Sequence, residues 1–217
     1  MKNLLQKELR LATSPLAYVF LAGALITLLP GYPILLSAFF ICFGLFHSFQ
    51  NAREANDTLY TALLPIPKRD FVSAKYAFVC LIQMIGFILC AVLTVLRMTV
   101  LSGGAAYVNN ALMNPSPVFL ALVLLIFTMF NLVFVGGFFR TGYKIGMPFL
   151  LFGVSVLFLV MIGEMLHYLP GLAFLNTTSG EKLGMELCVL AAAAIVYAGC
   201  TTLSWSVSKK RFERIDL

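Results

Sequence analysis

The sequence predicts an all-α integral membrane protein, and three observations support this. Of the 217 residues, 61% are hydrophobic and 11% are charged, compared with about 25% charged residues in an average soluble domain. The mean hydropathy is +0.96. The apolar residues form six stretches, most of them close to the ~20 residues that cross ~30 Å of hydrocarbon as a helix. We therefore expect six transmembrane helices, at residues 15–29, 33–49, 71–101, 118–139, 147–168 and 183–207.

An amphipathic segment precedes the first apolar stretch. Its apolar residues are Leu4, Leu5, Leu9 and Leu11, and its polar residues are Lys2, Gln6, Lys7 and Arg10. This near-helical spacing predicts an N-terminal interfacial elbow helix at residues 1–13. Ser14 and Pro15 then supply an N-cap and a first residue for the next helix. No small-residue cleavage site follows the basic start, so we do not expect a signal peptide that is removed.

The basic residues are distributed unevenly between the two ends of the predicted helices. If both termini are cytosolic, only Arg97 and Lys182 lie outside. The cytosolic side then holds Lys2, Lys7, Arg10, Arg53, Lys68, Arg69, Lys75, Arg140, Lys144, Lys209, Lys210, Arg211 and Arg214. This asymmetry predicts a multi-pass protein with both termini in the cytosol. Basic groups next to an anionic inner leaflet account for the net charge of +6, and nothing indicates nucleic acid as a partner.

The remaining composition excludes several function classes. The loops predicted outside are too short for an external substrate-capturing domain. No G-x-x-x-x-G-K-[ST] or G-x-G-x-x-G motif occurs, so the chain cannot hydrolyse ATP alone. All five cysteines lie inside apolar stretches without paired spacing, so we expect neither disulfides nor zinc. No metal or other cofactor is predicted in this chain.

A charged loop separates the second and third apolar stretches. Its first part predicts an amphipathic helix at residues 53–64. The apolar face of that helix would contain Ala55, Leu59, Ala62 and Leu63, with Ala52 on the same face directly before it. This face can meet membrane helices or a partner's groove, and Glu54 and Asp57 can meet basic groups on a partner. An ordinary amphipathic surface helix would show the same spacing.

A stiff connector follows this predicted helix. Pro65 and Pro67 each fix a φ angle and restrict the residue before them. The chain then reaches Lys68 and Arg69 at the start of the third apolar stretch. A stiff connector of this kind would transmit displacement from the loop to the membrane helix.

Two stretches of sequence resemble a known family. Lys7-Glu8-Leu9-Arg10 precedes the first apolar stretch, and Leu63 to Tyr76 reads LLPIPKRDFVSAKY. This order resembles the small permeases of the ABC-2 type exporter family, whose loop follows the pattern E…D…L-x-x-L-P-[VI]-[SP]-[RK]-[RK]-[DE]-[IF]-V-x-[AS]-K-Y. The chain looks most similar to permeases for peptides, bacteriocins and cytolytic peptides in Gram-positive bacteria. Pro67 stands where many relatives carry Ser, which predicts a stiffer connector with a weaker cap.

The resemblance implies a single permease domain at residues 1–217, with a cytosolic coupling loop at 51–70. Two permease subunits, identical or paralogous, would pair with two cytosolic ABC ATPases in the bacterial plasma membrane. ATP and magnesium would be bound by those ATPases. The complex would move an amphipathic or hydrophobic substrate, such as a peptide toxin or antimicrobial peptide, outward by alternating access.

The resemblance also implies which residues couple the chain to the ATPase. They are Glu54, Asp57, Leu59, Tyr60, Leu63, Pro65, Pro67, Lys68 and Arg69. Leu59 and Tyr60 are the expected anchors, because large central residues dominate the energy of small interfaces. Glu54 and Asp57 are expected at the rim, where charges mainly tune association rate.

A second set of residues lies near the predicted outer surface. Glu164 and His167 are three residues apart on one helix, and Arg97 lies at the end of the third stretch. They could form an outer gate, although solvation at the interface would select the same residue types. Glu164 and His167 are too few ligands for a metal site.

Two other functions remain as alternatives. Six helices in about 200 residues also describe the substrate-binding module of vitamin-type uptake transporters. Those modules use small residues four apart in the first helix, whereas Ala12, Ala17, Ala22 and Ala24 are each followed four positions on by Leu or Ile. A membrane-embedded hydrolase would need convergent ionisable residues at membrane depth, which His47, Glu164 and His167 do not offer.

Overall fold

A computed structural model describes residues 2–101, 103–104, 107, 110, 112–166, 168–169 and 182–215, without the side chains of Lys2 and Ala62. All regular elements in these residues are helical, in agreement with the predicted all-α class. They are α1 (Lys2–Lys7), the π-helix η1 (Glu8–Ala12), α2 (Pro15–Val19), the 3-10 helix η2 (Phe20–Leu28), α3 (Leu36–Glu54), α4 (Asp57–Leu63), α5 (Lys68–Thr99), α7 (Pro117–Met129), the π-helix η3 (Phe130–Val135), α8 (Gly136–Thr141), α9 (Gly146–Leu166) and α10 (Leu183–Glu213).

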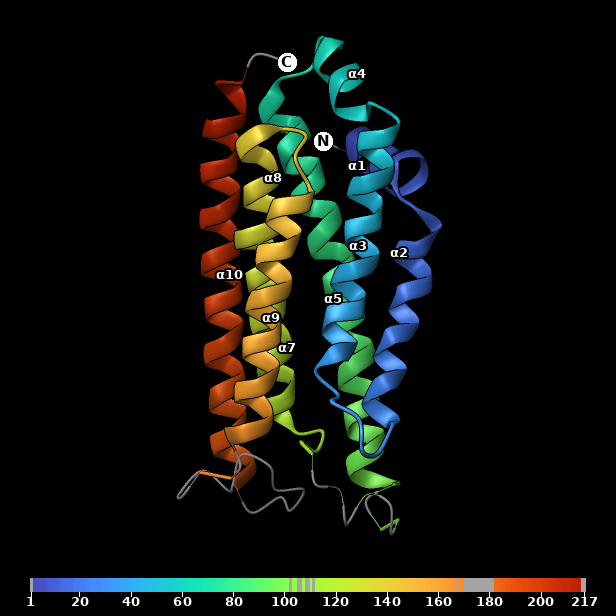
Figure 1. Cartoon of the computed structure of the whole chain (residues 1–217), viewed down its shortest axis with the longest axis vertical. Helices are drawn as coiled ribbons and strands as arrows, with labels where there is room; N and C mark the ends of the chain where they lie inside the picture. Colours follow the sequence, from blue (N-terminus) through green and yellow to red (C-terminus); the bar gives the residue numbers. More distant parts are fainter. Residues whose placement is uncertain are drawn as a thin grey trace.

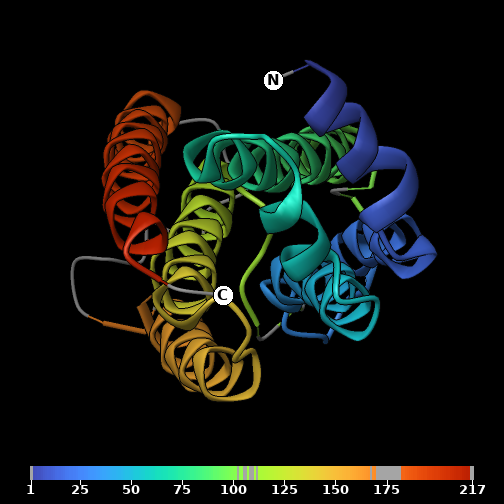
Figure 2. The same cartoon turned by 90° about the horizontal axis from the view of Figure 1, so that it is seen from above.

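The helices form an elongated bundle (Figure 1). The continuous rod α2–η2, then α3, α5, the rod α7–η3–α8, α9 and α10 run side by side along its long axis. Helix α4, the α8–α9 turn and both termini lie at one end of the bundle. Seen from that end, α4 lies across the bundle (Figure 2). The charged loop between α3 and α5 and the basic terminal segments therefore lie at the same end.

The number of membrane spans differs from the predicted six. Four helices in the described residues are long and apolar enough to cross a membrane, at Lys68–Thr99, Pro117–Thr141, Gly146–Leu166 and Leu183–Glu213. A fifth candidate is the bent pair Asn3–Ala12 and Pro15–Leu28, if the pair counts as one span. Helix α3 is not among the candidates, and its last turns carry the polar sequence HSFQNARE. The structure therefore supports a multi-pass membrane protein with four to five candidate spans.

The chain enters the bundle through a sharp bend. The two halves of the N-terminal pair meet at 91°. The Ser14 side chain accepts a hydrogen bond from the Leu16 backbone, and Pro15 occupies the first turn of α2, as the sequence predicted. This cap ends the N-terminal segment and sets the start of the long rod.

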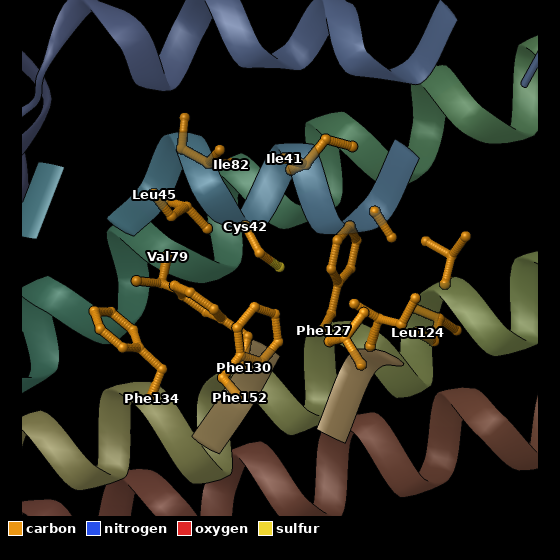
Figure 3. Close-up of a cluster of buried hydrophobic side chains, with 14 of the residues drawn as sticks. Ile41, Cys42, Leu45, Val79, Ile82, Leu124, Phe127, Phe130, Phe134 and Phe152 are labelled. Carbon is orange, nitrogen blue, oxygen red and sulfur yellow. The ribbon is translucent and has the colours of Figure 1, made fainter. Parts of the chain in front are cut away.

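The rod α7–η3 occupies the centre of the bundle. In its most apolar 18-residue window 78% of the residues are buried, compared with 17% for α9 and 11% for α10. Side chains from α3, α5 and α9 meet side chains of this rod (Figure 3). Large buried residues such as Phe127, Phe130 and Phe134 fill this core. Helices α9 and α10 consequently expose most of their apolar surface.

Candidate coupling site

The predicted helix at residues 53–64 is divided in two. Helix α3 ends at Glu54, and Asn56 adopts a left-handed conformation with φ 51° and ψ 28° before α4 begins. The sequence prediction of one continuous helix is therefore wrong. Asparagine is among the few residues that visit this conformation readily. The break turns α4 away from the axis of α3 and lays it across the end of the bundle (Figure 2).

The polar side of α4 faces the rest of the chain. The Lys7 ammonium lies 2.5 Å from Asp57 Oδ1 and donates a hydrogen bond of 2.7 Å to Thr61 Oγ1. Thr61 is buried, and the Asp57 side chain is only 13% exposed. These contacts fasten α4 to the end of α1.

Helix α5 joins the same group of charges. The Lys75 ammonium lies 2.5 Å from Glu8 Oε2 and 3.7 Å from Asp57 Oδ2. Lys7 is 3.8 Å from Glu8 Oε1. We call Lys7, Glu8, Asp57 and Lys75 the charge quartet. It contains two cations and two anions, so its formal charge is zero.

The centre of the charge quartet is shielded from solvent. The side chains of Lys75 and Glu8 are 3% and 2% exposed. The Lys75 ammonium lies 5.6 Å from the Phe49 ring centroid and 5.8 Å from that of Phe71. Charges buried this deeply are stable only when paired, because each loses its hydration. The charge quartet therefore ties three elements, α1–η1, α4 and α5, to one another.

The apolar side of α4 points away from the chain. The exposed fractions of Leu59, Tyr60 and Leu63 are 45%, 66% and 76%, and Leu64 is also exposed. A hollow of about 90 Å³ beside Leu59 is lined by Arg53, Asn56 and Tyr143 among others. An amphipathic helix usually buries its apolar side, and α4 does the opposite. Its exposed side offers an apolar surface with a small hollow at one edge.

The two acidic residues assigned to this surface take different places. Glu54 is exposed and accepts a hydrogen bond from Gln50 Nε2 at 3.1 Å. Asp57 belongs to the charge quartet instead. Lys7 and Lys75 of its own chain neutralise Asp57, whereas a place for Glu54 and Asp57 at the rim of a partner interface stays a prediction.

The connector after α4 ends against the C-terminal helix. Pro67 occupies the N-cap of α5 and makes no side-chain cap hydrogen bond, as its difference from Ser predicted. The Lys68 ammonium donates to the Ile215 carbonyl at 2.6 Å. Arg69 donates hydrogen bonds from Nε and Nη2 to the Glu213 carboxylate, and Nη2 lies 3.0 Å from Oε2. Thus Lys68 and Arg69 join the start of α5 to the end of α10.

The residues proposed as an outer gate have different partners. The Arg97 side chain is buried, donates to the Thr27 carbonyl at 2.6 Å and lies over the Tyr107 ring. Glu164 accepts a hydrogen bond of 2.7 Å from the Met113 backbone. His167 lies outside the described residues. Among the described contacts, Arg97 thus binds the end of η2, whereas Glu164 binds the segment before α7.

A buried polar cluster inside the bundle was not found from the sequence. Gln83 and Asn131 exchange two side-chain hydrogen bonds of 3.0 Å. Asn131 also donates to Thr201, and Tyr197 donates to Gln83 Oε1. The Ser204 hydroxyl donates to the Asn131 carbonyl at 2.7 Å, within the π-helical η3. The sequence signal for this cluster was the presence of amide side chains within apolar stretches, because polar side chains at that depth need partners.

Comparison with known protein families shows which family the chain belongs to. Residues 3–213 match the family model described as ABC-2 family transporter protein. The match covers nearly the whole described bundle, so the chain belongs to the ABC-2 family of transporter proteins. No curated protein and no solved structure gave a significant match. Family membership implies a membrane component that works with an ABC ATPase subunit.

Proposed function

We propose that the protein is the transmembrane subunit of an ATP-binding-cassette exporter and that α4 is the helix on which the ATPase docks. The observation that carries this proposal is the orientation of α4. Its polar side is bound by the charge quartet, and Leu59, Tyr60 and Leu63 are exposed. Exposed apolar residues on a short helix outside the candidate spans are typical of a partner-binding surface.

The contacts of α4 define how a force on it would spread. Asp57 binds Lys7 and Lys75, so displacement of α4 would reach the N-terminal helix and α5 directly. The connector ends at Lys68 and Arg69, whose partners lie at the end of α10. A single docking event would therefore act on the N-terminal elbow and on two long helices. Such contacts would allow a separate ATPase to drive alternating access.

Two such subunits would form the pathway, as identical copies or paralogues. One chain buries α7 at its centre and exposes the apolar surfaces of α9 and α10. An amphipathic substrate needs walls on both sides, because its polar groups cannot face lipid without a large cost. The proposed cargo is an amphipathic or hydrophobic molecule, in particular a peptide toxin or antimicrobial peptide. The resemblance of the coupling loop to peptide exporters supports this class.

The test is co-purification of the chain with an ABC ATPase encoded beside it. Leu59→Arg and Tyr60→Ala change exposed side chains of α4, so the protein should remain folded and inserted. Loss of an interface anchor commonly costs about 2 kcal/mol or more, which corresponds to roughly thirtyfold weaker docking. Tyr32→Ala is the matched control, since Tyr32 is 41% exposed and lies in the η2–α3 turn at the opposite end of the bundle.

The expected result is ATPase binding and export for wild type and Tyr32→Ala, with both lost for Leu59→Arg. Wild-type ATPase binding by Leu59→Arg and Tyr60→Ala would remove the docking role from α4. Export by the chain in the absence of any nucleotide-binding partner would reject the exporter subunit itself.

A further inference from the structure

A groove opens between α8 and α9 at the same end of the bundle as α4. Its volume is about 340 Å³, within the range of about 300–1,000 Å³ typical of ligand sites. Its lining includes Val133, Arg140, Lys144, Met147, Pro148 and Leu151. Two cations thus lie in a groove whose other walls are mainly apolar.

Neither of the two cations has an acidic partner among the described residues. Residues 71–163 contain no Asp or Glu. In the part of the chain that the structure describes, the ion pairs involve Lys7, Arg69 and Lys75 but neither Arg140 nor Lys144. The Lys144 ammonium lies 5.8 Å from the ring centroid of its neighbour Tyr143. The groove therefore carries two positive charges that an anion could neutralise.

Local geometry fixes the backbone that carries these two cations. Gly142 takes the left-handed conformation with φ 79° and ends α8. The Lys144 backbone then donates to Thr141 Oγ1 at 3.1 Å, which closes the turn. Gly137 lets α8 approach Pro148 closely, because a Cβ there would lie 2.9 Å from Pro148 Cβ. The turn and this close approach fix the backbone at Arg140 and Lys144, both of which line the groove.

The apolar lining continues along the outer face of α9. Leu151, Val154 and Phe158 are exposed and follow one another at helical spacings of three and four residues. They share one face of the helix. Since α9 is a candidate membrane span, this face would meet hydrocarbon in the subunit. A path of apolar side chains thus leads from the two cations toward the membrane interior.

We propose that the α8–α9 groove binds one anionic phospholipid, with its phosphate between Arg140 and Lys144 and an acyl chain along Met147 and Leu151. The groove matches such a lipid in charge and in polarity, because its two cations lie at the end of the bundle where lipid headgroups would be and its apolar lining continues along α9. Basic pockets between membrane helices bind such headgroups, and each cation near the surface favours an anionic lipid by roughly fivefold. In the orientation of the proposed function, the lipid would come from the inner leaflet.

The experiment uses quenching of a tryptophan in the groove by brominated lipids. The full chain has one tryptophan, Trp205. Trp205→Phe with Met147→Trp therefore gives a single fluorescent reporter at the groove. The protein is reconstituted into vesicles that contain brominated phosphatidylglycerol or brominated phosphatidylcholine. We expect the phosphatidylglycerol to compete for the groove at least fivefold better than the phosphatidylcholine.

Two double variants separate a specific site from general attraction. Arg140→Gln with Lys144→Gln should reduce the preference for phosphatidylglycerol over phosphatidylcholine to a ratio near one. Lys209→Gln with Lys210→Gln removes the same charge at the same end of the bundle, outside the groove, and should leave the preference unchanged. An equal loss in both double variants would show that the preference is only diffuse surface charge. Absence of quenching by either lipid would show that protein, such as a second copy of the chain, covers the groove. Either result would overturn the proposal.

Discussion

Lys75 Nζ lies 2.5 Å from Glu8 Oε2, although the two residues are far apart in the N-terminal half of the sequence. Both side chains are almost completely buried. Their pairing brings the N-terminal segment against α5, and Asp57 brings α4 to the same point. The stability of this end of the bundle therefore depends on charge neutrality within the charge quartet.

Removal of one buried charge should destabilise the protein strongly. We expect Lys75→Met to reduce the free energy of unfolding by about 3–5 kcal/mol, because Glu8 remains buried without its closest cation. Glu8→Met combined with Lys75→Met should recover most of this loss, since no isolated charge remains. Thermal unfolding of the detergent-solubilised protein measures both effects. Lys210→Met, at an exposed lysine of α10, is the control, and an equal midpoint for Lys75→Met and Lys210→Met would contradict the prediction.

The polar cluster around Asn131 should behave as one unit. The Asn131 side chain makes three hydrogen bonds, two with Gln83 and one with Thr201. At about 0.6 kcal/mol for each bond between membrane helices, Asn131→Leu should cost about 2 kcal/mol. Asn131→Leu combined with Gln83→Leu should cost less than the sum of the single changes. Denaturant unfolding of the single and double variants gives the coupling.

Thr202→Val provides the control for this cluster. Thr202 is exposed, and its hydroxyl donates to the Ala198 and Gly199 carbonyls of its own helix. We expect Thr202→Val to leave the free energy of unfolding almost unchanged. Strict additivity of the Asn131 and Gln83 substitutions would show that their side chains do not act together.

The break between α3 and α4 depends on the residue at position 56. Asn56→Gly should leave stability within about 0.5 kcal/mol of wild type, because glycine adopts positive φ freely. Asn56→Val should cost at least about 1 kcal/mol, since a β-branched residue is strained there. Ala55→Val is the control at a neighbouring exposed position whose φ is −78°. Unfolding midpoints of the three variants test the conformation directly, and equal effects of the two valine substitutions would contradict it.

The orientation in the membrane can be tested by cysteine labelling. Thirteen of the 15 basic residues would lie on the side of α4 and both termini, which predicts that this side is cytosolic. In a background without the five native cysteines, Tyr32→Cys should react with an impermeant reagent in intact cells. Asn56→Cys should react only after permeabilisation. The reverse pattern would invert the topology.

Sequence reasoning succeeded where the signal lies in the chain itself. The helical class, the Ser14 cap and the uncapped start of α5 at Pro67 each follow from the residues at those positions. The clustering of basic segments at one end of the bundle follows from the order of the apolar stretches. These features need no knowledge of what packs against them.

The orientation of α4 could not be found in the same way. A helical wheel shows which residues share a side, but not which side turns toward the rest of the chain. That choice depends on Lys7 and Lys75, whose ammonium groups need anions and attract Asp57. The same reason explains why the pairing of Gln83 with Asn131 was missed, because the sequence does not tell which amides face one another across two helices.

The contact between Lys68 and the Ile215 carbonyl has a practical consequence. It brings the C-terminal end of the described chain to the side of the connector that leaves α4. A fluorescent protein or affinity tag fused directly behind Ile215 would start next to the connector between α4 and α5. Such a fusion could be inserted correctly, fluoresce normally and still block assembly of the transporter. Tags for studies of the complete complex therefore belong on the ATPase.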